Sequence, residues 1–210
     1  MYNQLTINFS KDDVEYVNKM QQKVVILKEF LSNVIQVAWI TFGAFERNTI
    51  CWRNEYAVYA SRANTAVGSI IDKQSLSQIL PNGSTLQFKY GTFQLLNLND
   101  TYPYTVEYVR SSPFDEEEIT IGLAQPVIVN GQINAEPNIV SAQQMFFSNT
   151  ITMIPEEKIT VFMNSNTNNG QVINNMTNQA INLDFDQNYC HQSITYHNGT
   201  FILDKIERKY

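Results

Sequence analysis

The stretch "IVNGQI", residues 128–133, decides the fold because it places an Asn-Gly dipeptide between two short apolar runs. Both central residues of a type I′ turn need positive φ, and Asn followed by Gly tolerates that conformation well. The same dipeptide recurs close to alternating apolar residues at Asn82-Gly83, Asn169-Gly170 and Asn198-Gly199. We therefore expect four hairpin tips and a mostly antiparallel β structure.

The segments beside these turns have apolar residues at every second position, as strands with one buried face require. Examples are Leu86, Phe88 and Tyr90, then Tyr104, Val106 and Tyr108, then Ile159, Val161 and Met163, and then Ile181, Leu183 and Phe185. No internal repeat of fixed period is visible. The sequence predicts a mainly β, single domain over residues 1–210, namely an antiparallel two-layer β-sandwich, jelly-roll-like, with one short N-terminal helix.

The helix is expected near residues 11–21, because Ser10 can cap it and Asp13 follows three residues later. Residues 23–31 allow two interpretations. Their apolar residues extend a heptad stripe that would make a longer, oligomerising helix, whereas three consecutive β-branched residues, 24–26, favour a strand, which we prefer. The Asn-rich region near 164–182 is expected to be a loop and the most mobile segment.

Composition and charge exclude several classes of function. The net charge is −6, and the basic residues Lys205, Arg208 and Lys209 alternate with acidic ones, so we expect no binding to nucleic acid. No apolar run is long enough to span a bilayer, and residues 1–13 have neither the basic nor the apolar region of a signal peptide, so we expect a protein that is cytoplasmic or released without such a peptide. In a reducing compartment Cys51 and Cys190 are expected to be free thiols.

The stretch "FERNTICWRNEYAVYAS", residues 45–61, combines rings and charges more densely than any other. In a strand, Ile50 to Ala60 at even positions would form a core face, and Arg53, Glu55 and Tyr59 the opposite face. That opposite face is either ordinary strand surface or a ledge that grips sugar hydroxyls or another protein. Glu46 and Arg47, in the turn before it, complete the candidate binding residues.

Catalytic and metal-binding patterns are incomplete. His191 and His197 are the two histidines, and Cys190 next to His191 would point to the opposite face of a strand, so the sequence predicts no enzyme. Asp184 and Asp186 begin a calcium-loop pattern that lacks its glycine and its final glutamate, so we predict neither metal nor cofactor. The acidic run 115–118 is interpreted as a solvated turn.

The sequence favours a non-enzymatic protein and leaves two classes nearly equal. One is a recognition module, lectin-like, with a glycan or protein ligand. The other is a structural or storage subunit that self-assembles into a homo-oligomer through strand edges and amide side chains, since Asn and Gln make up 40 residues. An alternative is a pore-forming toxin-like protein, because residues 148–172 have the Ser, Thr and Asn content of membrane-inserting hairpins. A hydrolase is the remaining alternative.

Overall fold

The computed structural model describes residues 2–32, 34–98, 103–110, 118–174, 179–186 and 189–204. This part of the chain is mainly β, with one short helix, α1 (Lys11–Lys19), and several sheets, none of them closed. The prediction of a mainly β fold with a single short N-terminal helix is confirmed. None of the described helices is both long enough and apolar enough to span a bilayer.

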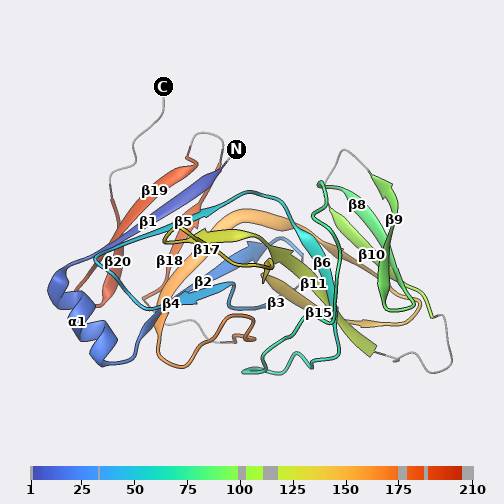
Figure 1. Ribbon diagram of the computed structural model, residues 1–210, viewed down its shortest axis with the longest axis horizontal. Helices are drawn as coiled ribbons and strands as arrows, with labels where there is room; N and C mark the ends of the chain where they lie inside the picture. The colour runs from blue at the N-terminus through green and yellow to red at the C-terminus, as the bar shows by residue number, and fades with distance from the viewer. Residues whose placement is uncertain are drawn as a thin grey trace.

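Four sheets organise the strands (Figure 1). Sheet 1 has the order β13 (Gln132–Ile133), β12 (Val127–Val129), β5 (Arg47–Trp52), β1 (Asn3–Phe9), β19 (His191–His197), β20 (Thr200–Leu203). Sheet 2 has the order β16 (Thr150–Met153), β10 (Tyr104–Tyr108), β8 (Ser84–Lys89), β9 (Thr92–Leu98). Sheet 3 has the order β3 (Ile35–Gln36), β15 (Ser141–Phe146), β11 (Glu118–Gln125), β6 (Ala57–Ser61), β7 (Ser75–Leu76), with β14 (Asn138–Ile139) also on β11. Sheet 4 has the order β18 (Ile181–Asp184), β17 (Pro155–Asn164), β2 (Lys23–Phe30), β4 (Ile40–Phe42).

The helix begins as its sequence predicts. Ser10 is the N-cap, its Oγ accepts a hydrogen bond of 3.1 Å from the Asp13 amide, and it donates one of 2.6 Å to the Asp13 carboxylate. Val17 is buried in the main core. Residues 23–30 form strand β2, so the preferred strand interpretation is confirmed and the long heptad helix is wrong.

The Asn-Gly dipeptides form hairpin tips in two places of the four. Asn130-Gly131 joins β12 to β13, and Asn198-Gly199 joins β19 to β20, with φ between 50° and 85° at all four residues. Gly83 precedes β8, whose partners β9 and β10 both come later, and Gly170 lies in a loop. At Asn82-Gly83 and Asn169-Gly170 the local sequence therefore specifies a turn, but it does not determine which strands pair.

Two pairings are parallel in a structure that is otherwise antiparallel among the described strands. Strand β1 runs parallel to β19, and β8 runs parallel to β10. Neither pair is joined by a tight turn, so turn geometry does not impose an antiparallel direction on them. The prediction of a mostly antiparallel structure is confirmed, with these two pairs as exceptions.

All four sheets contribute side chains to one main hydrophobic core, which includes Leu5 and Ile50, Leu86 and Tyr104, Val58 and Ile121, and Val24 and Val161. Two smaller clusters cover further faces. Tyr59 and Ala142 of sheet 3 pack with Val37, Ile71 and Val172 from loops, and Val25 and Phe162 of sheet 4 pack with Ala38. Sheets 3 and 4 thus bury apolar residues on both faces, as their continuous buried runs show.

Two predictions concern residues 148–182. Strand β16 pairs with β10 whereas β17 pairs with β2 and β18, so these two consecutive strands do not pair with each other. The described residues of the Asn-rich region between β17 and β18 form a loop, as predicted, but Thr167 and Val172 are buried and Val172 bridges to Val37, so the loop packs against the fold at these residues. Residues 175–178 lie outside the described residues.

Gly122 provides a test of this packing. A Cβ there would clash with the Ser141 carbonyl oxygen and lie 2.6 Å from Cε1 of Tyr59. We expect Gly122→Ala to lower the free energy of unfolding by at least about 3 kcal/mol, measured by urea denaturation. Gly43→Ala is the matched control, because the nearest atom to its added Cβ lies 3.7 Å away. Similar stability of the two variants would contradict the described contact.

Candidate functional site

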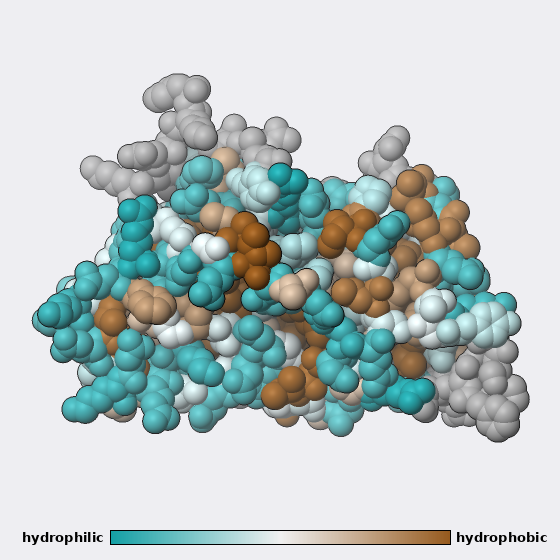
Figure 2. All heavy atoms as spheres, viewed as in Figure 1, coloured by the Kyte–Doolittle hydropathy of each residue, from teal (hydrophilic) through white to brown (hydrophobic). Residues whose placement is uncertain are grey.

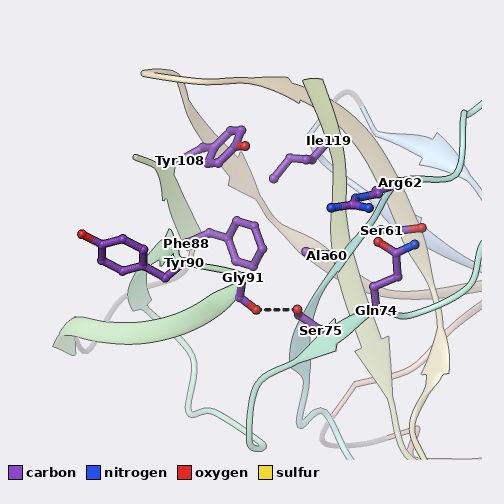
Figure 3. A pocket seen from close by; sticks show the side chains of 10 residues that line it. All are labelled: Ala60, Ser61, Arg62, Gln74, Ser75, Phe88, Tyr90, Gly91, Tyr108 and Ile119. Carbon is purple, nitrogen blue, oxygen red and sulfur yellow. Dashed lines mark hydrogen bonds between the residues drawn. The ribbon is translucent and has the colours of Figure 1, made fainter. Parts of the chain in front are cut away.

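A cleft lies where the β8–β9 hairpin of sheet 2 meets strands β6 and β7 of sheet 3. It consists of two adjoining hollows of about 250 and 470 Å³ that share Ser75 and Gly91. Figure 3 shows the smaller one, which is lined by Ala60, Ser61, Arg62, Gln74, Ser75, Phe88, Tyr90, Gly91, Tyr108 and Ile119. The larger hollow continues along Leu76, Ser77, Gln78, Thr92, Phe93 and Leu95.

The hairpin tip beside the cleft is Tyr90-Gly91. Both residues have positive φ, 53° and 71°, as a type I′ turn requires. The Ser75 hydroxyl donates a hydrogen bond of 2.6 Å to the Gly91 carbonyl, which ties the tip to strand β7 (Figure 3). The expected alternation that buries Tyr90 is therefore wrong at this residue, because the chain turns there and leaves its ring 69% exposed.

The two walls of the cleft differ in chemistry. Figure 3 shows Phe88, Tyr90 and Tyr108 on one side and the side chains of Arg62 and Gln74 on the other. The rings of Phe88 and Tyr108 lie 5.8 Å apart between centroids, and the Phe88 ring points towards the polar wall while the Tyr90 ring turns outward at the rim. Phe88 and Tyr108 belong to the main core and are 8% and 4% exposed, so the exposed aromatic surface of the cleft is chiefly the Tyr90 ring at the rim, on the side that faces the Arg62 and Gln74 side chains.

The predicted ledge is only partly assembled. Arg53 and Glu55 form an exposed ion pair of 3.6 Å, and the Arg53 guanidinium lies 4.1 Å from the centre of the Tyr2 ring. Tyr59, in contrast, is fully buried and donates a hydrogen bond of 2.8 Å to the Ser141 carbonyl, and burial raises its pKa well above the usual range. Its inclusion in an exposed ledge is wrong, because loop residues cover that face of sheet 3.

The other candidate binding residues line separate hollows along β5. Arg53 and Glu55 border a hollow of about 220 Å³ with Tyr2, Cys51 and Ile133. Arg47 borders a shallower one of about 560 Å³ with Phe45 and Asn130. Glu46 is exposed, and its backbone carbonyl accepts a hydrogen bond from the Phe9 amide. Residues 47–61 form two strands, β5 and β6, separated at 53–56, instead of the single strand that the sequence predicts, and Arg47 begins β5 instead of lying in the turn before it. The candidate binding residues therefore do not share one site.

The two cysteines are free, as expected. Cys51 on β5 is half-buried, which raises the pKa of its thiol, and Cys190 is buried just before β19. Strand β1 separates the two cysteines. Its residue Gln4 pairs with Cys51 of β5 on one side, and the backbone N–H of Gln4 donates a hydrogen bond to the Cys190 carbonyl on the other side. The neighbouring His191 is exposed, so the predicted arrangement of a buried cysteine beside an exposed histidine is confirmed.

The acidic candidates have local roles. Asp184 lies 3.8 Å from Lys158, and Asp186 accepts a hydrogen bond from the Tyr189 amide. Within the described ranges, no three His, Cys, Asp or Glu side chains come together in a way that suits a metal ion. Glu118 is exposed at the start of β11. The rest of the acidic run, residues 115–117, and the basic residues Lys205, Arg208 and Lys209 lie outside the described part of the chain.

No protein-family model, curated protein or solved structure matches this chain. The geometry of the cleft and of the core is therefore the basis for the functional proposals below.

The contrast between Tyr59 and Arg53 can be measured directly. Tyr59→Ala removes a buried ring and a hydrogen bond, and we expect it to lower the free energy of unfolding by about 3–5 kcal/mol. Arg53→Ala removes a half-exposed ion pair, and we expect a loss of no more than about 1 kcal/mol. Urea denaturation measures the free energy of unfolding of both variants. Equal losses of that free energy would contradict the assignment of Tyr59 to the core.

Proposed function

We propose that this protein is a non-enzymatic recognition protein that binds a carbohydrate in the cleft between β8–β9 and β6–β7. The observation that carries the proposal is the pairing of an aromatic wall with a polar wall (Figure 3). The apolar face of a sugar ring packs against an aromatic side chain, and its hydroxyls require hydrogen-bonding partners. The two walls supply these groups on facing sides.

The size and make-up of the cleft also support binding of an extended ligand. Hollows of about 250 and 470 Å³ that share Ser75 and Gly91 form one elongated site, within the usual range for small-molecule pockets. The titratable side chains among its lining residues are Arg62, Tyr90 and Tyr108. They include no carboxylate, histidine or cysteine, so the lining suits binding better than acid–base or nucleophilic chemistry.

The proposal rests on a fold that we infer to be a two-layer sandwich in one domain. The β5–β6 segment pairs with the β12–β11 segment, which connects sheets 1 and 3. Strands β16 and β17 follow each other closely and connect sheets 2 and 4. The main core shared by all four sheets would then lie between the layer of sheets 1 and 3 and the layer of sheets 2 and 4.

A glycan array, followed by titration of the best sugar, tests the proposal with variants at both walls. Tyr90→Asn removes the rim ring and creates an Asn-Gly turn, so the hairpin is kept, and Gln74→Ala removes an exposed amide of the polar wall. We expect each to weaken binding about five- to tenfold. Tyr16→Ala, which removes a ring that is 59% exposed on α1, and Gln132→Ala are controls expected to bind normally. The proposal is wrong if the protein binds no sugar on the array, or if the control variants lose as much affinity as the variants of the two walls.

Edge strand β9 favours a second function, self-assembly. It is the last strand of sheet 2, its sequence TFQLLNL contains no charge, and Leu95, Leu96 and Leu98 are 44%, 49% and 53% exposed. Figure 2 shows an apolar area at the upper right, where Figure 1 places β9. An uncharged edge lacks the lysines that commonly prevent edge pairing. We infer that β9 of a second copy pairs with it antiparallel, as two-fold symmetry allows.

Light scattering coupled to size-exclusion chromatography, over a hundredfold range of concentration, tests this assembly. We expect a dimer or larger species for the natural chain, and a monomer for the variant with both Leu96→Lys and Leu98→Lys, because the new charges would be buried on pairing. Leu31→Lys changes a leucine that is 70% exposed outside β9 and is expected to leave the assembly intact. A natural chain that remains monomeric throughout would exclude assembly through β9.

A further inference from the structure

Lys28 is a lysine inside the main core. It lies on the same face of β2 as Val24 and Ile26, which belong to that core, and only 1% of its surface is exposed. Its Nζ lies 5.5 Å from the Trp39 ring centre and 5.3 Å from the Trp52 ring centre. Among the described residues, the Lys28 ammonium has neither a hydrogen bond nor an ion pair. Such a group costs free energy whenever it is charged.

The surroundings of Lys28 offer little compensation. Trp52, whose ring lies beside Lys28, has its Nε1 buried without a hydrogen-bond partner among the described residues, and an indole N–H only donates, so it cannot accept a hydrogen bond from the ammonium. The two elements that face Lys28 across the core contribute the indole rings of Trp39 and Trp52, which do not titrate. Glu157, which is exposed on β17, is the charged group that acts on the amine. The rings attract a cation but do not replace its lost water.

Lys28 also lies at the point where several strands are interrupted. Trp52 is the last residue of β5 and precedes the break at 53–56, and Val127 pairs with it directly after Pro126, which separates β11 from β12. On the other side, the pairing of β17 with β2 shifts register between Pro155 and Ile159, and Ile159 is the partner of Lys28. We call this region, residues 52–57, 125–127 and 155–159 around Lys28, the joint.

We propose that Lys28 is a pH-sensing residue, whose protonation in mildly acidic surroundings places an uncompensated charge in the core and loosens the joint. This inference goes beyond the proposed carbohydrate binding and does not depend on it. The fold supplies a buried amine, two indole rings and interrupted strands at one place, so a change of charge there acts on the contacts between sheets.

The direction of the effect follows from the two states of the chain. Burial lowers the pKa of Lys28 from 10.5 to about 7, and the negative charge of Glu157 opposes this shift. Between these two pH values the unfolded chain holds the proton and the folded chain does not. The stability of the fold therefore falls as the pH is lowered from 10.5 towards 7, and the folded chain acquires the buried charge as the pH falls through about 7.

Tryptophan fluorescence tests the proposal, because the two tryptophans of the chain, Trp39 and Trp52, both flank Lys28. We expect the emission of the natural protein to titrate between pH 5 and 9 with a midpoint near 7, since a cation beside an indole changes its emission. Lys28→Met should abolish this titration. Lys158→Met is the matched control, because the hydrogen bond that Lys158 donates to the Glu156 carboxylate raises the pKa of Lys158 and keeps it charged across this range.

Two further variants keep the test decisive. Replacement of both His191 and His197 by Gln removes the two imidazoles of the chain, and the midpoint should remain. Glu157→Gln, an exposed change that the fold tolerates even if Lys28→Met does not fold, should move the midpoint to lower pH. Hydrogen exchange at pH 5.5 and 8, with each rate divided by the intrinsic amide rate at that pH, should show lower protection of the joint at the lower pH in the natural protein. Three results would overturn the proposal. The tryptophan emission of the natural protein does not change with pH, the change disappears when both histidines are replaced, or Glu157→Gln leaves its midpoint where it was.

Discussion

The antiparallel pairing of residues 47–61 with residues 118–129 is the constraint on which the remaining structure depends. In this ribbon β5 pairs with β12 and β6 pairs with β11, so the same two chain segments pass through sheet 1 and sheet 3. Pro126 cannot donate a backbone hydrogen bond, and the ladder is interrupted where it stands. Every other strand of these two sheets is added to one side or the other of the ribbon. Gly122 is needed within it, because Tyr59 packs directly over that residue.

Much of the fold could be predicted from local sequence, and its long-range pairings could not. The Ser10 cap, the β-branched run of β2 and the Asn130-Gly131 turn depend on residues close together in the chain, and all three are confirmed. The parallel pairing of β1 with β19 joins residues from opposite ends of the described chain. No short pattern encodes such a pair, because its stability comes from burial and not from a turn.

The candidate site was harder to predict than the fold. Alternation placed Tyr59 on the same face as Arg53, but it does not reveal that loops cover that face of sheet 3. The cleft was missed because its residues come from six different strands and the loops beside them. Lys28 did leave a signal, since Val24, Ile26 and Lys28 alternate along a predicted strand whose first two members are apolar. A charged residue that continues the apolar face of a strand predicts a charge buried in the core, and Lys28 is such a residue.

The position of β1 has a consequence for biosynthesis. This strand lies inside sheet 1, between β5 and β19, yet it is translated long before residues 191–197. At roughly 5–20 residues per second, its parallel partner emerges from the ribosome on the order of 10–40 seconds later. During that interval one edge of β1 has no partner strand, and sheet 1 remains incomplete. The nascent chain therefore needs protection of that edge, either by a chaperone or by temporary pairing with another segment, until β19 is synthesised.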